Sequence, residues 1–102
     1  MPGFVFKLIP PRDNFAIDMS EAERATMTEH VDYWRALMAE GRVVAFGPVA
    51  DTAGPYGIGI ILADDLPAAH ALCAADPAVR SSHGFRTDIA PMLRLVTPDA
   101  VY

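Results

Sequence analysis

Two residues of this chain have the chemistry of an acid–base pair, and the sequence places both on helix faces that point toward one core. His30 lies in a segment, residues 20–41, whose apolar residues recur at helical spacing, and Asp76 ends a second apolar helix. In such a pair the carboxylate fixes the imidazole tautomer and stabilises the imidazolium, while the other ring nitrogen transfers a proton. The residue types predict proton-transfer chemistry, with His30 as general acid/base and Asp76 as its orienting partner.

The first helix explains why His30 is informative. At about 100° per residue, the face expected to point inward carries Met27, Val31, Trp34, Leu37 and Met38 with His30 beside them, and the opposite face carries Glu21, Arg24, Thr28, Asp32 and Arg35. Burying a polar group without a partner costs about 1–3 kcal/mol. An inward histidine therefore needs a partner, either as a satisfied core residue or as part of a site.

The second helix is expected over residues 66–75, capped by Asp64 or Asp65. Its inner face is marked by Ala69, Leu72 and Cys73, and Asp76 falls on that face one turn later. An acid at a helix C-terminus is locally unfavourable. Asp76-Pro77 is also an ordinary helix stop, because the residue before a proline is displaced from the helical region.

The remaining elements define the fold class. Strands are expected over residues 4–9, 43–49, 56–63 and 85–90. The second is expected to be interrupted at Gly47-Pro48, and residues 92–96 are expected to extend the fourth past Pro91. Loops are expected over residues 12–19 and 77–84. Ser20 and Glu23 form a capping box that begins the first helix, and Gly41 ends it. The order β-α-β-β-α-β predicts an α+β, ferredoxin-like plaited sheet with both helices on one face.

The strands are apolar on both faces, as Val5 and Leu8, then Val43 and Val44, then Ile58 and Ile60 illustrate. A monomer of this fold would leave one face of the sheet in water as a large apolar patch. We therefore expect a homodimer that packs sheet against sheet.

Composition narrows the class of protein. The chain has 102 residues, which we interpret as one domain over residues 1–102, and 52% of them are hydrophobic. The net charge of −5 and eight scattered basic residues argue against nucleic acid and against an anionic membrane surface. The N-terminus lacks the pattern of a signal peptide, no apolar run is long enough to span a bilayer, and the lone Cys73 allows no internal disulfide. A cytoplasmic setting is expected.

Several further residues are candidates for the site. Phe6, Trp34 and Phe46 are expected to line a pocket between the helices and the sheet, where Gly47 and Pro48 would let backbone approach a ligand. Two loop residues are candidates at its mouth: Arg12, to hold a ligand carboxylate, and His83, as a second polar group. A solvated loop residue is the competing interpretation of each, and His70 is interpreted as peripheral.

No metal and no cofactor are expected. A metal site needs three convergent ligands, and only His30, Asp76 and His83 are candidates, with no metal-ligand spacing among them. The glycines of residues 54–59 precede no helix and do not form a dinucleotide loop. A buried Cys73 is interpreted as a core residue.

Two stretches resemble the YCII-related domain family. The first is His30-Val31-Asp32-Tyr33-Trp34 followed by Leu37, residues 40–44 and Phe46-Gly47-Pro48-Val49, and the second is residues 74–79, Ala-Ala-Asp-Pro-Ala-Val. The resemblance covers residues 4–91. It implies a dimeric α+β barrel of ferredoxin-like protomers with an active site on a His–Asp pair, which falls here on His30 and Asp76. The fold is shared with isomerases, monooxygenases and heme-handling proteins, so the fold alone transfers no function.

Together these features predict a small cofactor-independent enzyme that performs isomerisation, elimination or hydrolysis on a small organic acid, lactone or carbonyl compound. No serine or cysteine is evidently placed as a nucleophile, which favours proton transfer over covalent catalysis. The alternative is a non-catalytic metabolite-binding or dimerisation module, in which the His30–Asp76 pair only specifies helix packing. A third interpretation is an oxygen-dependent or heme-linked monooxygenase with His30 as a ligand.

Overall fold

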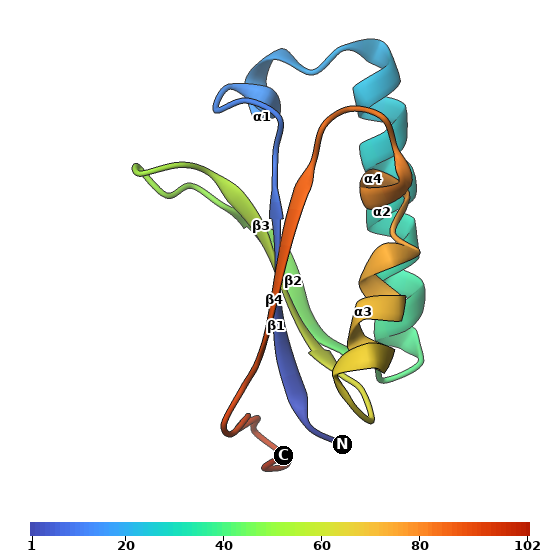
Figure 1. The fold of residues 1–102 in the computed structure, drawn as a ribbon, viewed down its shortest axis with the longest axis vertical. Coiled ribbons are helices and arrows are strands. Elements are labelled where there is room, and N and C mark those ends of the chain that lie inside the picture. Colours follow the sequence, from blue (N-terminus) through green and yellow to red (C-terminus); the bar gives the residue numbers. More distant parts are fainter.

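A single four-stranded antiparallel sheet with its long helices on one face organises the chain, as the computed structural model of residues 1–102 shows (Figure 1). The elements are, in chain order, β1 (Gly3–Ile9), α1 (Phe15–Asp18), α2 (Glu21–Ala39), β2 (Val43–Val49), β3 (Tyr56–Leu62), α3 (Leu66–Ala74), α4 (Pro77–Arg80) and β4 (Arg86–Pro91). The strand order is β2-β3-β1-β4. The predicted α+β, ferredoxin-like pattern is confirmed.

Local signals fix both ends of α2, which carries His30, and the start of α3. Ser20 caps α2 by accepting from the Glu23 amide at 3.1 Å, and the Glu23 carboxylate accepts from the Ser20 amide at 2.8 Å. After α2, Gly41 adopts a φ of 77°, a left-handed conformation that favours glycine. Asp65, and not Asp64, caps α3 by accepting from the Ala68 amide at 2.8 Å.

Two predicted loops contain short helices, and one predicted extension is wrong. The loop over residues 12–19 includes α1, because Phe15 is buried there and packs edge-on against Phe85 at 5.1 Å between ring centroids. The loop over residues 77–84 begins with α4. Residues 92–96 do not extend β4, which ends at Pro91; instead Val96 pairs with Val101 in a small C-terminal turn.

Two finer expectations also need correction. Strand β2 is not interrupted at Gly47-Pro48 but runs through both residues, because β2 is an edge strand, where a missing proline N–H is tolerated. On α2 the buried stripe is centred on Trp34 and Leu37 and includes Glu23, whereas Val31 and Met38 are 37% and 38% exposed at its flanks.

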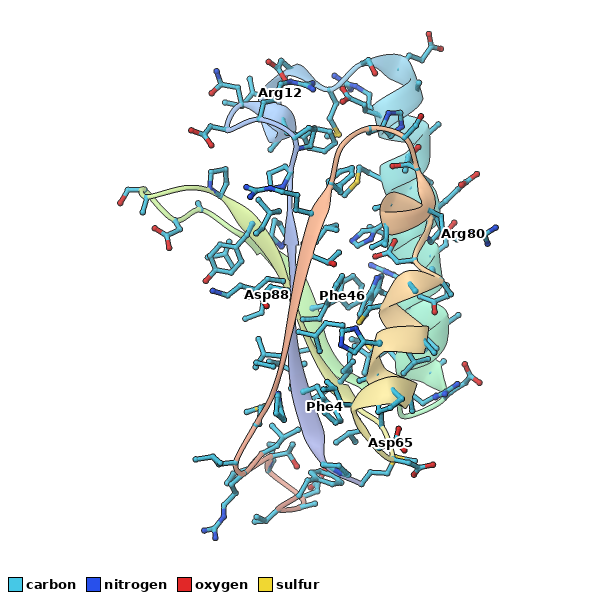
Figure 2. The ribbon with its side chains drawn as sticks, in the orientation of Figure 1. Phe4, Arg12, Phe46, Asp65, Arg80 and Asp88 are labelled. Carbon is cyan, nitrogen blue, oxygen red and sulfur yellow. The ribbon has the colours of Figure 1, made fainter.

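The covered face of the sheet is built in cross-strand rows. The central row is Ile89–Phe6–Gly59–Phe46, read from β4 to β2. Gly59 leaves a gap in this row, and the Trp34 indole fills it, stacked on Phe6 at 5.2 Å and tilted against Phe46 at 6.2 Å between ring centroids. Phe46 and the Phe4 of the next row point toward the helices (Figure 2).

The opposite face of the sheet has no helix on it. One of its rows, Ala90–Val5–Ile60–Ala45, is entirely apolar. In the next row Asp88 and Lys7 are paired across β4 and β1, and Asp88 points away from the helices (Figure 2). None of the helices combines the length and the hydrophobicity that a membrane-spanning segment requires.

The gap at Gly59 gives the first testable prediction. A Cβ at Gly59 would lie 3.1 Å from Cζ3 of Trp34, which is already held by Phe6, whereas a Cβ at Gly57 would meet Leu8 at an ordinary 3.5 Å. We expect Gly59→Ala to lower the free energy of unfolding by about 1–3 kcal/mol, because overpacking displaces the indole. The matched Gly57→Ala should be neutral or stabilising by about 0.4–1 kcal/mol. Urea unfolding of both variants checks this, and equal effects would contradict it.

Candidate active site

Asp76 is a fully buried carboxylate that begins a helix, and does not end one as the sequence pattern indicated. Helix α3 stops at Ala74, and Asp76 is the N-cap of α4, where its Oδ1 accepts from the Ala78 amide at 2.8 Å. Its exposure is 0%. An N-cap is a favourable position for an acid, so the expected clash with a helix C-terminus does not arise.

His30 reaches this carboxylate from the middle of α2. Its Nδ1 lies 2.9 Å from Oδ1 and 2.8 Å from Oδ2 of Asp76, across 46 residues of sequence. An ionised carboxylate only accepts hydrogen bonds, so Nδ1 carries the proton that joins the two groups. The pair is therefore oriented in one way, with Nδ1 toward Asp76 and Nε2 away from it.

The outward nitrogen of His30 remains available. Nε2 makes no hydrogen bond within the chain, and no buried side-chain nitrogen or oxygen lacks a partner, so Nε2 has access to open space. The His30 side chain is 13% exposed, against 0% for Asp76. This arrangement suits a proton-transfer group with one nitrogen held and the other free.

Trp34 is a third member of the network. Its indole Nε1–H donates to Asp76 Oδ2 at 2.7 Å, in a bond that is itself buried. With Ala78 and His30, three N–H groups thus hold the carboxylate, which is how a buried charge is usually stabilised. The sequence predicted Trp34 as a pocket wall and missed this role, although an indole N–H in an apolar stripe is a signal that a partner is needed.

A cavity of about 440 Å³ opens in front of His30, between α2 and the sheet. The structure brings six of the residues singled out by the sequence to its wall, namely Phe6, His30, Trp34, Phe46, Gly47 and Pro48. It adds residues that the sequence analysis missed, among them Phe15, Met19 and Phe85. Apolar residues inside a predicted loop, as at Phe15 and Met19, were the available signal, because they need something to pack against.

Arg12 and His83 are not part of this wall. Arg12 lies beside α1 (Figure 2), where its guanidinium bonds both Glu23 oxygens at 2.7 and 2.9 Å and Asp18 Oδ1 at 2.9 Å. His83 Nε2 instead lies 2.9 Å from the Thr26 hydroxyl. No group of three metal-ligating side chains forms, because His83 does not join His30 and Asp76.

Two further ionisable side chains, Cys73 and Tyr33, lie in the hydrophobic core or pack against it. Cys73 is 2% exposed, and burial, together with the Asp76 charge, raises the pKa of its thiol to about 12. Burial also raises the pKa of Tyr33, whose hydroxyl donates to the Leu72 carbonyl at 2.6 Å and so joins α2 to α3. Cys73 therefore stays a neutral thiol near pH 7, as expected of a core residue.

The fold and the site define a ferredoxin-like α+β protein with a buried His–Asp pair at an apolar cavity. Residues 4–93 match the model of the YCII-related domain. The chain therefore belongs to the YCII-related domain family. No curated protein gives a significant match to the chain.

The Arg12–Glu23 contact predicts how stability changes in acid. Hydrogen bonds from Arg12, and then from the Ser20 amide, lower the pKa of Glu23 from 4.5 to about 2. Folding depresses the pKa of Glu23, so the contribution of this carboxylate to the free energy of unfolding is complete above about pH 4.5. That contribution is lost as the pH falls toward 2. We expect Glu23→Gln to lower the urea midpoint at about pH 6 and to lose less stability than wild type between about pH 6 and 3. Glu29→Gln, an exposed change on α2, is the control; an unchanged pH dependence in Glu23→Gln would contradict the prediction.

Proposed function

We propose that this protein is a small acid/base enzyme that needs no cofactor and acts on a small organic acid, lactone or carbonyl compound. The observation that carries the proposal is the asymmetry of His30, whose Nδ1 is held by a fully buried carboxylate, while Nε2 has no partner in the chain and the residue lines the cavity. Isomerisation, elimination and hydrolysis all need a proton to be moved at such a position.

The proposed proton transfer follows from the hydrogen bonds. Neutral His30 accepts a proton from the bound substrate at Nε2 and becomes an imidazolium, whose positive charge the Asp76 carboxylate stabilises through Nδ1. Trp34 and the Ala78 amide keep the carboxylate in place throughout. The imidazolium then returns a proton from Nε2 to the product, so the protein ends in its starting state.

The alternative, a non-catalytic binding or dimerisation module, differs in what it needs from His30. If the pair only specified helix packing, both imidazole nitrogens would be satisfied inside the core. A cavity of about 440 Å³ that touches His30 favours the enzyme instead. The same cavity is also of the size that binds small molecules, roughly 300–1,000 Å³.

Substitution of the pair tests the proposal. We expect His30→Gln to lower turnover by about 10²–10⁴-fold, because it removes the proton carrier while keeping a polar side chain of similar reach. Turnover is measured across a panel of small lactones, organic acids and carbonyl compounds. His70→Gln, an exposed histidine on α3, is the matched control and should leave turnover unchanged. Equal activity in His30→Gln and wild type would contradict the proposal.

Asp76→Asn adds a readout that needs no substrate. In the wild type, ¹⁵N shifts of the neutral His30 ring should show the proton on Nδ1, because Asp76 accepts it there. In Asp76→Asn this preference should weaken, since the amide has an N–H₂ group as well as an oxygen. An unchanged tautomer would mean that Asp76 does not orient His30.

We also propose that the protein is a homodimer in which two sheets pack face to face. The uncovered face carries the apolar row Ala90–Val5–Ile60–Ala45, and such a surface is costly to leave in water. A two-fold axis would bury the same row on both protomers.

The dimer makes a direct prediction. We expect wild type to sediment as a dimer at micromolar concentration and Ile60→Asp to sediment as a folded monomer, because the charge would face an apolar partner. Ala71→Asp, an exposed change on α3, is the control and should remain dimeric. A monomeric wild type at these concentrations would overturn this proposal without affecting the role of His30.

A further inference from the structure

The wall of the cavity is almost entirely apolar, and this composition bears on what it binds. Of the 21 residues around it, 14 are hydrophobic, and none is Lys, Arg, Asp or Glu. The side chains there that carry a nitrogen or oxygen are His30, Trp34 and Tyr56.

Of the two polar side chains other than His30, Trp34 is bonded within the core and Tyr56 lies on the other face of the sheet. The Trp34 N–H is bonded to Asp76 at 2.7 Å. Tyr56 alternates along β3 with Gly57 and Gly59, which lie on the covered face, so its ring is on the uncovered face, where the Lys7 ammonium lies 4.8 Å from its centroid. His30 Nε2 is thus the side-chain polar atom that the cavity offers to a ligand.

Lys7 and Arg12, two cations close in sequence to residues of the wall, have other partners. Lys7 lies on the uncovered face with Tyr56, and Arg12 has its guanidinium on Glu23 and Asp18. The charged group bonded to a residue of the wall is the carboxylate of Asp76, which holds His30. An anionic ligand would lose hydration in this cavity without gaining a fixed counter-charge, and desolvating an unpaired charge is strongly unfavourable.

The scarcity of polar side chains in the wall also restricts the type of reaction. Hydrolysis needs an oriented water and donors for an oxyanion, and elimination is helped by a second acid at the leaving group. One imidazole nitrogen in an apolar wall can orient a water, but the wall offers no side-chain donor for the oxyanion and no second acid. That nitrogen suffices for a reaction in which a proton is taken from one carbon and returned to another on the same face of the substrate.

We infer that the cavity selects a neutral, flat, largely apolar carbonyl compound with an acidified C–H, and that His30 Nε2 both removes and returns the proton. This inference rests on the proposed function and narrows it to an isomerase. The C–H electron pair delocalises into the carbonyl as an enolate while Nε2 gains the proton. The imidazolium then protonates the far carbon of the delocalised system, so electrons and protons balance without another reactant.

The shape of the wall fits such a substrate. The Trp34 indole is stacked on Phe6, with 11° between their ring planes, and Phe46 is tilted against the indole, so the wall is built of flat aromatic rings. A planar delocalised enolate packs against flat rings along its whole face. Since the wall offers no side-chain donor for the enolate oxygen, the substrate itself must stabilise the anion, as a benzylic or conjugated ketone does.

Two probes of matched shape test the selectivity for neutral ligands. One is 2-tetralone, a flat bicyclic ketone with a benzylic acidified C–H, and the other is 1,2,3,4-tetrahydronaphthalene-2-carboxylate, which carries a negative charge on a similar framework. Binding is followed by the indole N–H signal of Trp34, which is unambiguous because the chain has one tryptophan. We expect the ketone to bind about tenfold or more tightly than the carboxylate. Equal or tighter binding of the carboxylate would overturn the inference.

Deuterium exchange separates this result from a failure of the proposed function. In D₂O, wild type should accelerate exchange at the benzylic carbon of 2-tetralone, and His30→Gln should bind the ketone within about threefold but lose the acceleration. If the carboxylate binds best while other C–H acids still exchange through His30, only the substrate class is overturned. If the ketone binds selectively without exchange that depends on His30, the isomerase and the acid/base function are both overturned, and the binding module takes their place.

Discussion

The burial of the Asp76 carboxylate is the constraint on which the rest of the structure depends. A fully buried charge costs several kcal/mol in lost hydration, and only well-placed donors offset that cost. The donors come from α2, through His30 and Trp34, and from the first turn of α4, through Ala78. Helices α2 and α4 must therefore keep one relative position, or the charge is left unpaired.

This constraint ties the packing of the core to the geometry of the site. Trp34 reaches Asp76 because Gly59 leaves room for its ring above β3, and Phe6 holds that ring in place. The same ring is part of the cavity wall. A ligand that presses on Trp34 thus acts on a residue bonded to the carboxylate that orients His30, so binding and proton transfer share one side chain.

Much of this arrangement follows from the sequence, because local signals were strong where they mattered. The Ser20–Glu23 capping box and the bounds of β2 required no tertiary information. Helical periodicity predicted that His30 and Asp76 both point toward the shared sheet. Their contact, across 46 residues of sequence, depends on the fold and not on either helix alone.

What the sequence did not reveal depends on contacts between distant segments. The sequence left Arg12 available to bind a ligand. In the fold its guanidinium donates instead to the Glu23 carboxylate, which the capping box with Ser20 holds in place. Asp76 resembled a helix end because α4 has only four residues, too few for periodicity to detect. The indole of Trp34 carried no sign of which buried acceptor it would find.

The open nitrogen of His30 distinguishes a site from a merely structural pair. Replacing a buried ion pair by apolar residues of similar size is often neutral or stabilising, so stability alone gives little reason for this pair in the core. In a purely structural pair, the polar atoms of both side chains would also be hydrogen-bonded within the core. Here Asp76 is fully buried, with both carboxylate oxygens hydrogen-bonded, whereas His30 has Nδ1 bonded and Nε2 without a partner and lines an apolar cavity. The fold thus stabilises a charge on one side of a single imidazole and leaves the other side to a ligand, which is the division of roles that proton transfer requires.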